Sequence, residues 1–259
     1  MGYFTCENVT KLFGGLKALN NVSFEVEKGE IFALIGPNGA GKSTVFNCLN
    51  RFYNVDSGRF IFKDKDITHL PPHQIALHGI ARTFQNIELF KKMTLIDNLL
   101  LARHIRRKSN IFSEMCFLPS LQKQEIASRE KAEEIIDFLD LQHYRDQLVE
   151  NLPYGIQKII ELGRALTMEP EIILLDEPTS GMNVEESQDL TFWITDIKEQ
   201  WGITLIVVEH NMKFVRELAD KVMVLSFGEV IAQGKTSDVL NNPEVINAYL
   251  GDKNAALKG

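Results

Sequence analysis

The sequence predicts an α/β fold in which a parallel sheet forms the core and a helical block is inserted into it. Three features lead to this prediction. A glycine-rich loop follows the apolar run Ile31–Ile35 and precedes a helix. From Glu171 onward, apolar runs alternate with helical segments, which is the rhythm of parallel strands joined by crossover helices. Between these parts, from about residue 72 to residue 168, the signals are helical: Ile126, Ile135, Ile136 and Leu139 follow helical spacing, with Glu and Lys between them.

The N-terminal part combines short strands with turns. Val22–Ile35 gives a strand, a tight turn at Lys28-Gly29 and a second strand. Phe60–Phe62 and Asp66-Ile67 have the composition of further short strands. We therefore expect an antiparallel β section near the N-terminus, attached to the parallel core.

Residues 36–44 read Gly-Pro-Asn-Gly-Ala-Gly-Lys-Ser-Thr and fit the pattern of a phosphate-binding loop. Glycines let the backbone wrap a phosphate chain, and the following helix N-terminus adds positive potential. Lys42 can reach the β- and γ-phosphates, while the Ser43 hydroxyl can bind Mg²⁺. The structural alternative is a plain glycine-rich turn before a helix. We expect nucleotide contacts from Asn38, Gly39, Gly41, Lys42, Ser43 and Thr44.

A second motif is the apolar run 172–175 followed by Asp176, Glu177 and Pro178. Two acids after such a run are often only a solvated strand end. After a phosphate-binding loop in the same chain, they have a chemical use. Asp176 can hold Mg²⁺ through water, and Glu177 can polarise the water that attacks the γ-phosphate. The expected ligands are therefore ATP and Mg²⁺.

The order of these motifs resembles the ATP-binding subunits of ABC transporters over nearly the whole chain. By this resemblance, Phe13 before Gly14-Gly15-Leu16 stacks on adenine, although it could also be a core residue. Gln85 looks like the glutamine that senses Mg²⁺ and links the core to the helical part; a surface glutamine is the alternative. His210 looks like the histidine at the γ-phosphate, or else is a histidine at a strand end. Residues 180–183 occupy the loop that crosses to a partner subunit.

The resemblance implies a RecA-like P-loop NTPase core with an antiparallel β subdomain and an inserted α-helical subdomain. We place the first part of the core, with its β section, at residues 1–86 and the helical subdomain at 87–165. Residues 166–259 then form the second part of the core and a C-terminal tail.

The family's signature element corresponds to Leu152–Ile156, which departs from the usual Leu-Ser-Gly-Gly-Gln. Pro153 lacks the hydroxyl and the backbone donor that would touch a γ-phosphate. Tyr154 and Gly155 remain as expected contacts, weakened but not absent. With one phosphate loop and one signature, the chain should be half of a head-to-tail dimer, with itself or with a different ATP-binding subunit. We hypothesise that ATP is hydrolysed more slowly in the pocket closed by this signature than in the other pocket of the dimer.

Several stretches resemble the ATPase subunits of branched-chain amino acid importers, namely 79–90, Pro153-Tyr154-Gly155, 209–215 and 242–251. ATPases for urea, lipopolysaccharide or other amino acids share part of this pattern. The resemblance implies transmembrane permease subunits as partners, and indirectly an extracytoplasmic solute-binding protein. The chain would then be peripheral, at the cytoplasmic face of the inner membrane. Segment 103–120 could dock a permease or cover the core, and we favour the second interpretation.

Composition excludes several other functions. No run approaches the roughly 18 apolar residues of a spanning helix, and the start of the chain lacks the features of a signal peptide. The net charge of −7 makes nucleic acid an unexpected partner. The three cysteines are too widely spaced for a zinc site or a disulfide framework. A soluble ABC ATPase usually has two cassettes or long coiled-coil insertions, and we expect neither from this sequence. A P-loop kinase needs an acceptor site and a lid, and Glu177 and His210 disfavour it.

Overall fold

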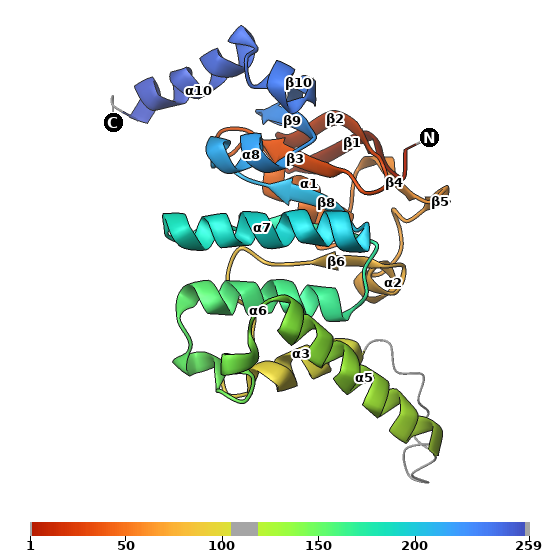
Figure 1. Cartoon of the computed structure of the whole chain (residues 1–259). Coiled ribbons are helices and arrows are strands. Elements are labelled where there is room, and N and C mark those ends of the chain that lie inside the picture. Colours follow the sequence, from red (N-terminus) through yellow and green to blue (C-terminus); the bar gives the residue numbers. More distant parts are fainter. Residues whose placement is uncertain (1, 105–118, 257–259) are drawn as a thin grey trace.

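The computed structural model describes residues 2–104 and 119–256. Within these residues, the central sheet has six strands in the order β10-β9-β3-β8-β7-β6 (Figure 1). All neighbours pair in parallel except β10, which is antiparallel to β9 at one edge. The strands are Ile31–Ile35 (β3), Ile80–Arg82 (β6), Ile172–Asp176 (β7), Thr204–Val208 (β8), Lys221–Ser226 (β9) and Glu229–Lys235 (β10). This sheet confirms the predicted α/β class.

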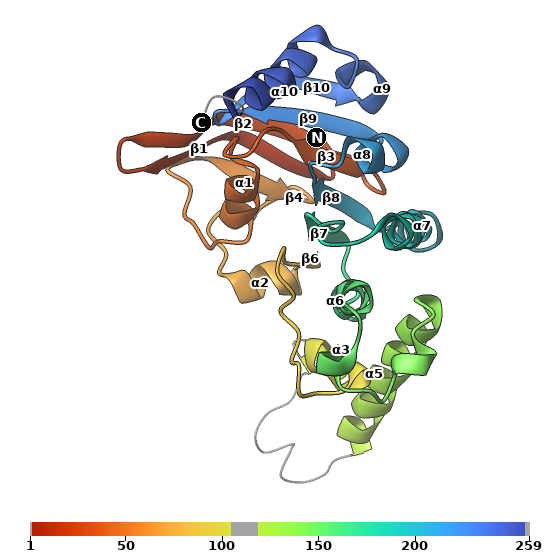
Figure 2. The same cartoon turned by 90° about the vertical axis from the view of Figure 1, so that its left-hand side faces the viewer.

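The central sheet has hydrophobic cores on both faces, because successive side chains of a strand point to opposite faces. Ile172 and Leu174 of β7 belong to one core, while Ile173 and Leu175 belong to the other. Helices cover both faces, as Figure 2 shows. The first core includes α1 (Lys42–Leu49) and α2 (Pro72–Leu77); the second includes α7 (Val184–Trp201) and α8 (Met212–Leu218). The chain ends in α9 (Thr236–Val239) and α10 (Pro243–Ala256).

A separate antiparallel sheet, in the order β2-β1-β4-β5, packs beside the central one. Its strands are Phe4–Phe13 (β1), Leu16–Val26 (β2), Ser57–Phe62 (β4) and Lys65–Asp66 (β5). The two sheets meet through aromatic rings: Phe24 of β2 stacks on Phe32 of β3, with 5.0 Å between centroids and 13° between planes. The stack fixes the first half of β3, the strand that leads into the loop at residues 36–41, against the antiparallel sheet.

The helical part consists of α3 (Leu95–Arg103), α5 (Pro119–Phe138) and α6 (Tyr154–Thr167), which lie together at the end of the molecule away from the antiparallel sheet (Figure 1). Thr94 caps α3 by accepting a hydrogen bond from the Asp97 backbone N–H at 3.2 Å. Leu99, Ile135 and Leu162 share one core with strands β7 and β8. The helical part is therefore packed on the face of the sheet that also carries α7.

Three details differ from the sequence-based expectation. The stretch 72–168 contains the strand β6, whose three residues are too few to show a period of two. The sequence predicts a helix over Gln157–Met168, after the signature, but this helix begins at Tyr154, inside the signature, with Pro153 as its N-cap residue. The helix α10 runs through Ala256, into the expected tail. Residues 105–118, most of segment 103–120, lie outside the described residues.

In the described parts of the chain, no helix combines the length and the apolar character that crossing a membrane requires. The division of the chain at residues 86 and 165 stays a prediction.

Replacing Phe32 by Ala should lower the free energy of unfolding by about 3–5 kcal/mol, since it removes a fully buried ring and leaves a cavity between the sheets. Chemical denaturation measures this change. The matched control is Phe192→Ala on the exposed face of α7, which should change stability by no more than about 0.5 kcal/mol. Equal effects of the two changes would contradict the role given to the stacked rings.

Candidate active site

A depression of about 410 Å³ opens where the loop 36–41 meets the end of β7. One side of it is polar and includes Lys42, Ser43 and Glu177, while another side is apolar. Asn38, Gly39, Gly41 and Thr44 also line it, so all the loop residues predicted from the sequence lie there. The full lining is Phe13, Leu16, Lys17, Ala18, Asn38, Gly39, Ala40, Gly41, Lys42, Ser43, Thr44, Glu177 and Phe227.

The loop at 36–41 is shaped to surround an anion. Gly41 has a φ of +105°, and a Cβ atom there would lie 2.7 Å from the Ala18 carbonyl oxygen, so only glycine fits. The helix α1 begins at Lys42, directly after this loop, so its N-terminus, with the positive end of the helix dipole, lies at the depression. The Lys42 ammonium is buried and donates hydrogen bonds to the carbonyls of Gly36 at 2.7 Å and Pro37 at 3.0 Å.

Asp176, the last residue of β7, is held by a buried ion pair. Arg82 of β6 donates from Nη2 to Asp176 Oδ2 at 2.7 Å, and their side chains are 9% and 5% exposed. Arg82 also donates from Nη1 to Asn47 Oδ1 of α1 at 2.9 Å. The second carboxylate oxygen, Asp176 Oδ1, is buried and has no hydrogen-bond partner among the described residues. This oxygen and the Ser43 hydroxyl are the candidate cation ligands, although only Ser43 lines the depression itself.

Glu177, Gln85 and His210, which are far apart in the sequence, meet in space. Gln85 donates from Nε2 to Glu177 Oε2 at 3.0 Å, and His210 Nδ1 lies 3.8 Å from the same oxygen. Glu177 has a φ of +46°, a strained conformation for a residue with a side chain. Its backbone N–H donates to the Val208 carbonyl at 2.9 Å, which fixes the turn. The strained turn brings the carboxylate to the rim of the depression.

Phe13 lies at the end of β1, on the rim of the depression, and 41% of it is exposed. Its ring makes an edge contact with Tyr53, with centroids 5.0 Å apart, and Lys11 Nζ lies 5.3 Å from its centroid. The ring is therefore outside the hydrophobic core and is available to a flat apolar ligand.

Tyr154 and Gly155 do not line this depression. Tyr154 instead packs on the loop after β7: its hydroxyl donates to the Ser180 carbonyl at 3.4 Å, and a Cβ at Gly181 would lie 2.8 Å from its ring. A Cβ at Gly155 would lie 2.3 Å from Glu186 Oε1, in the first turn of α7. The signature segment is thus fastened to α7 and is separate from this chain's own phosphate loop.

Two buried charges on α6 hold the loop that carries Gln85. Lys158 donates from Nζ to the Gln85 carbonyl at 2.6 Å, and Glu161 Oε1 accepts from the backbone N–H groups of Phe84 at 3.4 Å and Glu88 at 3.5 Å. Burial lowers the pKa of Lys158 and raises the pKa of Glu161. Sequence reasoning missed this pair, although charges three residues apart on an apolar helix face were a usable signal.

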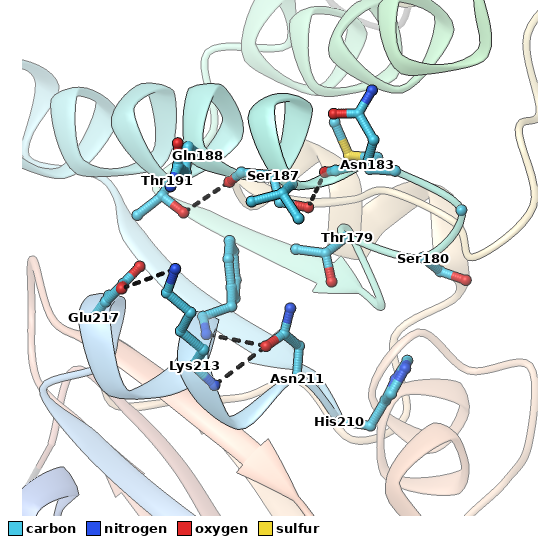
Figure 3. A pocket seen from close by; sticks show the side chains of 14 residues that line it. Thr179, Ser180, Asn183, Ser187, Gln188, Thr191, His210, Asn211, Lys213 and Glu217 are labelled. Atoms are coloured by element: carbon cyan, nitrogen blue, oxygen red, sulfur yellow. Dashed lines mark hydrogen bonds and ion pairs between the residues drawn. The ribbon is translucent and has the colours of Figure 1, made fainter.

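Glu209, also missed, joins the loops after β7 and β8. It is fully buried and its carboxylate accepts from the Thr179 backbone N–H at 2.9 Å and hydroxyl at 2.6 Å. Its other oxygen accepts from the backbone N–H groups of His210 at 2.9 Å and Asn211 at 3.1 Å. A second depression, of about 460 Å³, opens beside this junction between α7 and α8, and Figure 3 shows Thr179, His210 and Asn211 along it.

Comparison with known proteins agrees with this geometry. Residues 19–180 match the ABC transporter family, and residues 229–254 match the family described as branched-chain amino acid ATP-binding cassette transporter. The chain is 40% identical over 240 residues to the high-affinity branched-chain amino acid transport ATP-binding protein LivG of Escherichia coli K12, covering 93% of this chain and 94% of that one. It is 38% identical over 244 residues to BraF of Pseudomonas aeruginosa, covering 94% and 96%.

Among solved structures, the chain is similar to the ADP conformation of MJ1267, an ATP-binding cassette of an ABC transporter. The TM-score is 0.84 at 36% identity, and the match covers 97% of this chain and 99% of that one.

Replacing Arg82 by Met should destabilise the fold by about 3–5 kcal/mol, because it leaves the Asp176 carboxylate buried without its partner. Denaturant titration of the purified chain measures the effect. Arg59→Met is the matched control: it breaks the exposed pair with Glu7, where water screens the charges, and it should leave the midpoint nearly unchanged. If the two variants unfold at the same denaturant concentration, the buried pair does not hold Asp176 as described.

Proposed function

The chain belongs to the ABC transporter family, and from this premise we propose that it is the ATP-hydrolysing subunit of a transporter for branched-chain amino acids. The observation that carries the proposal is that Lys42, Ser43 and Glu177 line one depression, at the carboxyl edge of a parallel sheet. The naming of LivG and BraF as branched-chain amino acid transport proteins supports the choice of solute.

Hydrolysis needs a base beside the terminal phosphate. In our proposal, Glu177 accepts a proton from water as that water attacks the γ-phosphorus, and the bond to the bridging oxygen breaks to give ADP and phosphate. Gln85 and His210 flank the same carboxylate oxygen and orient the carboxylate and the phosphate. Lys42 and the backbone of residues 36–44 hold the phosphate chain, and Phe13 stacks on the adenine ring.

Mg²⁺ fits the oxygen atoms at this site. Asp176 Oδ1 is buried and lacks a partner among the described residues, and the exposed Ser43 follows Lys42 in the first turn of α1. No group of three or more acidic, histidine or cysteine side chains in the described residues forms a metal cage. That is expected for Mg²⁺, which usually takes one or two protein ligands together with phosphate oxygens. When bound, the ion would neutralise charge on the β- and γ-phosphates, with Asp176, Ser43 and Gln85 around it.

A second ATP-binding subunit is needed to complete the site. The signature residues Tyr154 and Gly155 are fastened to the loop after β7 and to α7, outside this chain's own depression. In our proposal they close the nucleotide site of a partner cassette, which is either a second copy or a different subunit. Tyr154 contacts Ser180 and Gly181, so the loop at residues 180–183 would lie at the same interface.

A permease would dock in an apolar groove of about 370 Å³ between α2, α3, β6 and α6. Phe52 and Phe90 line it and are exposed, and Leu101 of α3 is exposed beside them. Arg82, which holds Asp176, and Phe84, which precedes Gln85, also line this groove. A permease side chain in the groove would therefore contact both of them. Docking there would place the chain peripherally, at the cytoplasmic face of the inner membrane, with a solute-binding protein acting from the other side.

We expect the chain, tagged in its native cell and solubilised gently from membranes with ATP present, to bring down two polytopic permeases and a second ATPase. Replacing Leu101 by Glu should abolish recovery of the permeases, since it places a charge in the apolar groove. Mass spectrometry of the eluates identifies the proteins recovered with the unmodified chain and with the Leu101→Glu variant.

The control for the groove is Phe192→Glu on the exposed face of α7, outside the groove, which should retain the permeases. Recovery of the unmodified chain with ribosomes or nucleic acid alone would refute the transporter assignment.

Replacing Glu177 by Gln should lower ATP turnover by at least about 100-fold, because the amide cannot accept the proton from water. ATP binding should persist, so ATP-bound dimers should accumulate. Phosphate release measures turnover, and size-exclusion chromatography with ATP measures dimers. The control is Glu185→Gln in the first turn of α7, which should hydrolyse ATP normally. A fully active Glu177→Gln protein would remove this carboxylate from the mechanism.

A further inference from the structure

The hairpin between β9 and β10 has an unusual residue at its tip. Ser226 pairs with Glu229, which leaves a two-residue loop of Phe227 and Gly228. Both loop residues have positive φ, +47° and +80°, as in a type I′ turn. Such turns favour Asn-Gly or Asp-Gly, and a bulky side chain with positive φ is strained. The ring of Phe227 is also 91% exposed, so burial does not offset this strain.

The turn is nevertheless fixed against the phosphate loop. The Gly228 backbone N–H donates to the Ala40 carbonyl at 2.9 Å, and the Gly228 carbonyl accepts from the Asn20 N–H at 2.8 Å. A Cβ atom at Gly228 would lie 2.7 Å from the Ala18 carbonyl oxygen, so the turn lies tightly against β2. These contacts hold the backbone of Phe227 in a defined place beside the candidate nucleotide site.

Phe227 continues an apolar strip along one side of that site. Phe13 of β1 pairs with Leu16 of β2, so the two side chains share a face of the hairpin. Ala18 lies two residues further along β2, on the same face as Leu16, and the Phe227–Gly228 turn is packed beside it. All four side chains line the one depression, whose polar side is formed by Lys42, Ser43 and Glu177.

We propose that Phe227 is a second aromatic contact for the base of the bound nucleotide, in addition to Phe13. The inference rests on the proposed function, because it assumes that ATP is the ligand of this depression. The phosphate chain is held by residues 36–44, so the base falls toward the apolar strip. An aromatic ring there can stack on any base face, which adds affinity without reading the base's hydrogen-bonding groups.

The test compares ATP with inorganic tripolyphosphate, which carries the phosphates without a base. Replacing Phe227 by Asn removes the ring and supplies the residue that a type I′ turn favours, so the hairpin should be retained. Calorimetric titration of the full chain should show about a tenfold loss of ATP affinity and no change for tripolyphosphate. Phe227→Trp should retain the affinity for ATP. Phe192→Asn removes an exposed ring that does not line the depression, so the affinities for ATP and for tripolyphosphate should both stay unchanged.

Unchanged ATP affinity in Phe227→Asn would overturn the inference, and so would equal losses for both ligands, which would mean that the turn only shapes the phosphate loop. If Phe227→Asn binds ATP normally as a single chain but no longer forms dimers, Phe227 contacts the partner subunit instead of the base. Failure of the proposed function is a separate result. The unmodified chain would then bind neither ATP nor tripolyphosphate, and Lys42→Ala would not change the calorimetric titration of either ligand.

Discussion

The hydrogen-bond ladder that joins β3, β8 and β7 in parallel brings three loops to one edge of the sheet. Leu34 of β3 and Asp176 of β7 both pair with Val208 of β8, so the three strands end at the same level. Each strand then leads directly into a functional loop: the phosphate loop starts two residues after Leu34, Glu177 follows Asp176, and Glu209 follows Val208. Because parallel strands share a direction, the groups that they carry must meet there. A slip of one residue in the register of β7 would turn Asp176 to the opposite face of the sheet.

Buried charges then tie the surrounding loops and α6 to this edge. Arg82 is held on Asp176, Glu209 joins the loops after β7 and β8, and Lys158 and Glu161 hold the loop of Gln85 on α6. Each group is removed from water, so losing its partner is costly, and these contacts act as fixed links. Lys158 of α6 holds the Gln85 carbonyl, and the Gln85 side chain donates to Glu177, so hydrogen bonds connect α6 to Glu177 without a gap.

Much of this architecture could be predicted because its signals are local. The phosphate loop has its own sequence pattern, and Asp176 and Glu177 directly follow an apolar strand; the fold class and the family that they indicated are confirmed. What escaped prediction depends on distant partners. Neither Arg82 nor Glu209 differs locally from an ordinary charge near a strand end, and the three residues of β6 carry no detectable period. The catalytic roles of Glu177, Gln85 and His210, and the metal role of Asp176, stay predictions.

The position of Lys42 has a consequence for how quickly and tightly a phosphate can bind. Its ammonium is held by two carbonyls of its own loop, so its side chain is ordered before any ligand arrives. Fixing a long flexible lysine side chain costs roughly 2 kcal/mol of conformational entropy. In this chain that entropy is lost during folding, and a polyphosphate that enters meets a cation already in place. Association then depends mainly on desolvation and on the arrival of the ligand, with little reordering of the protein.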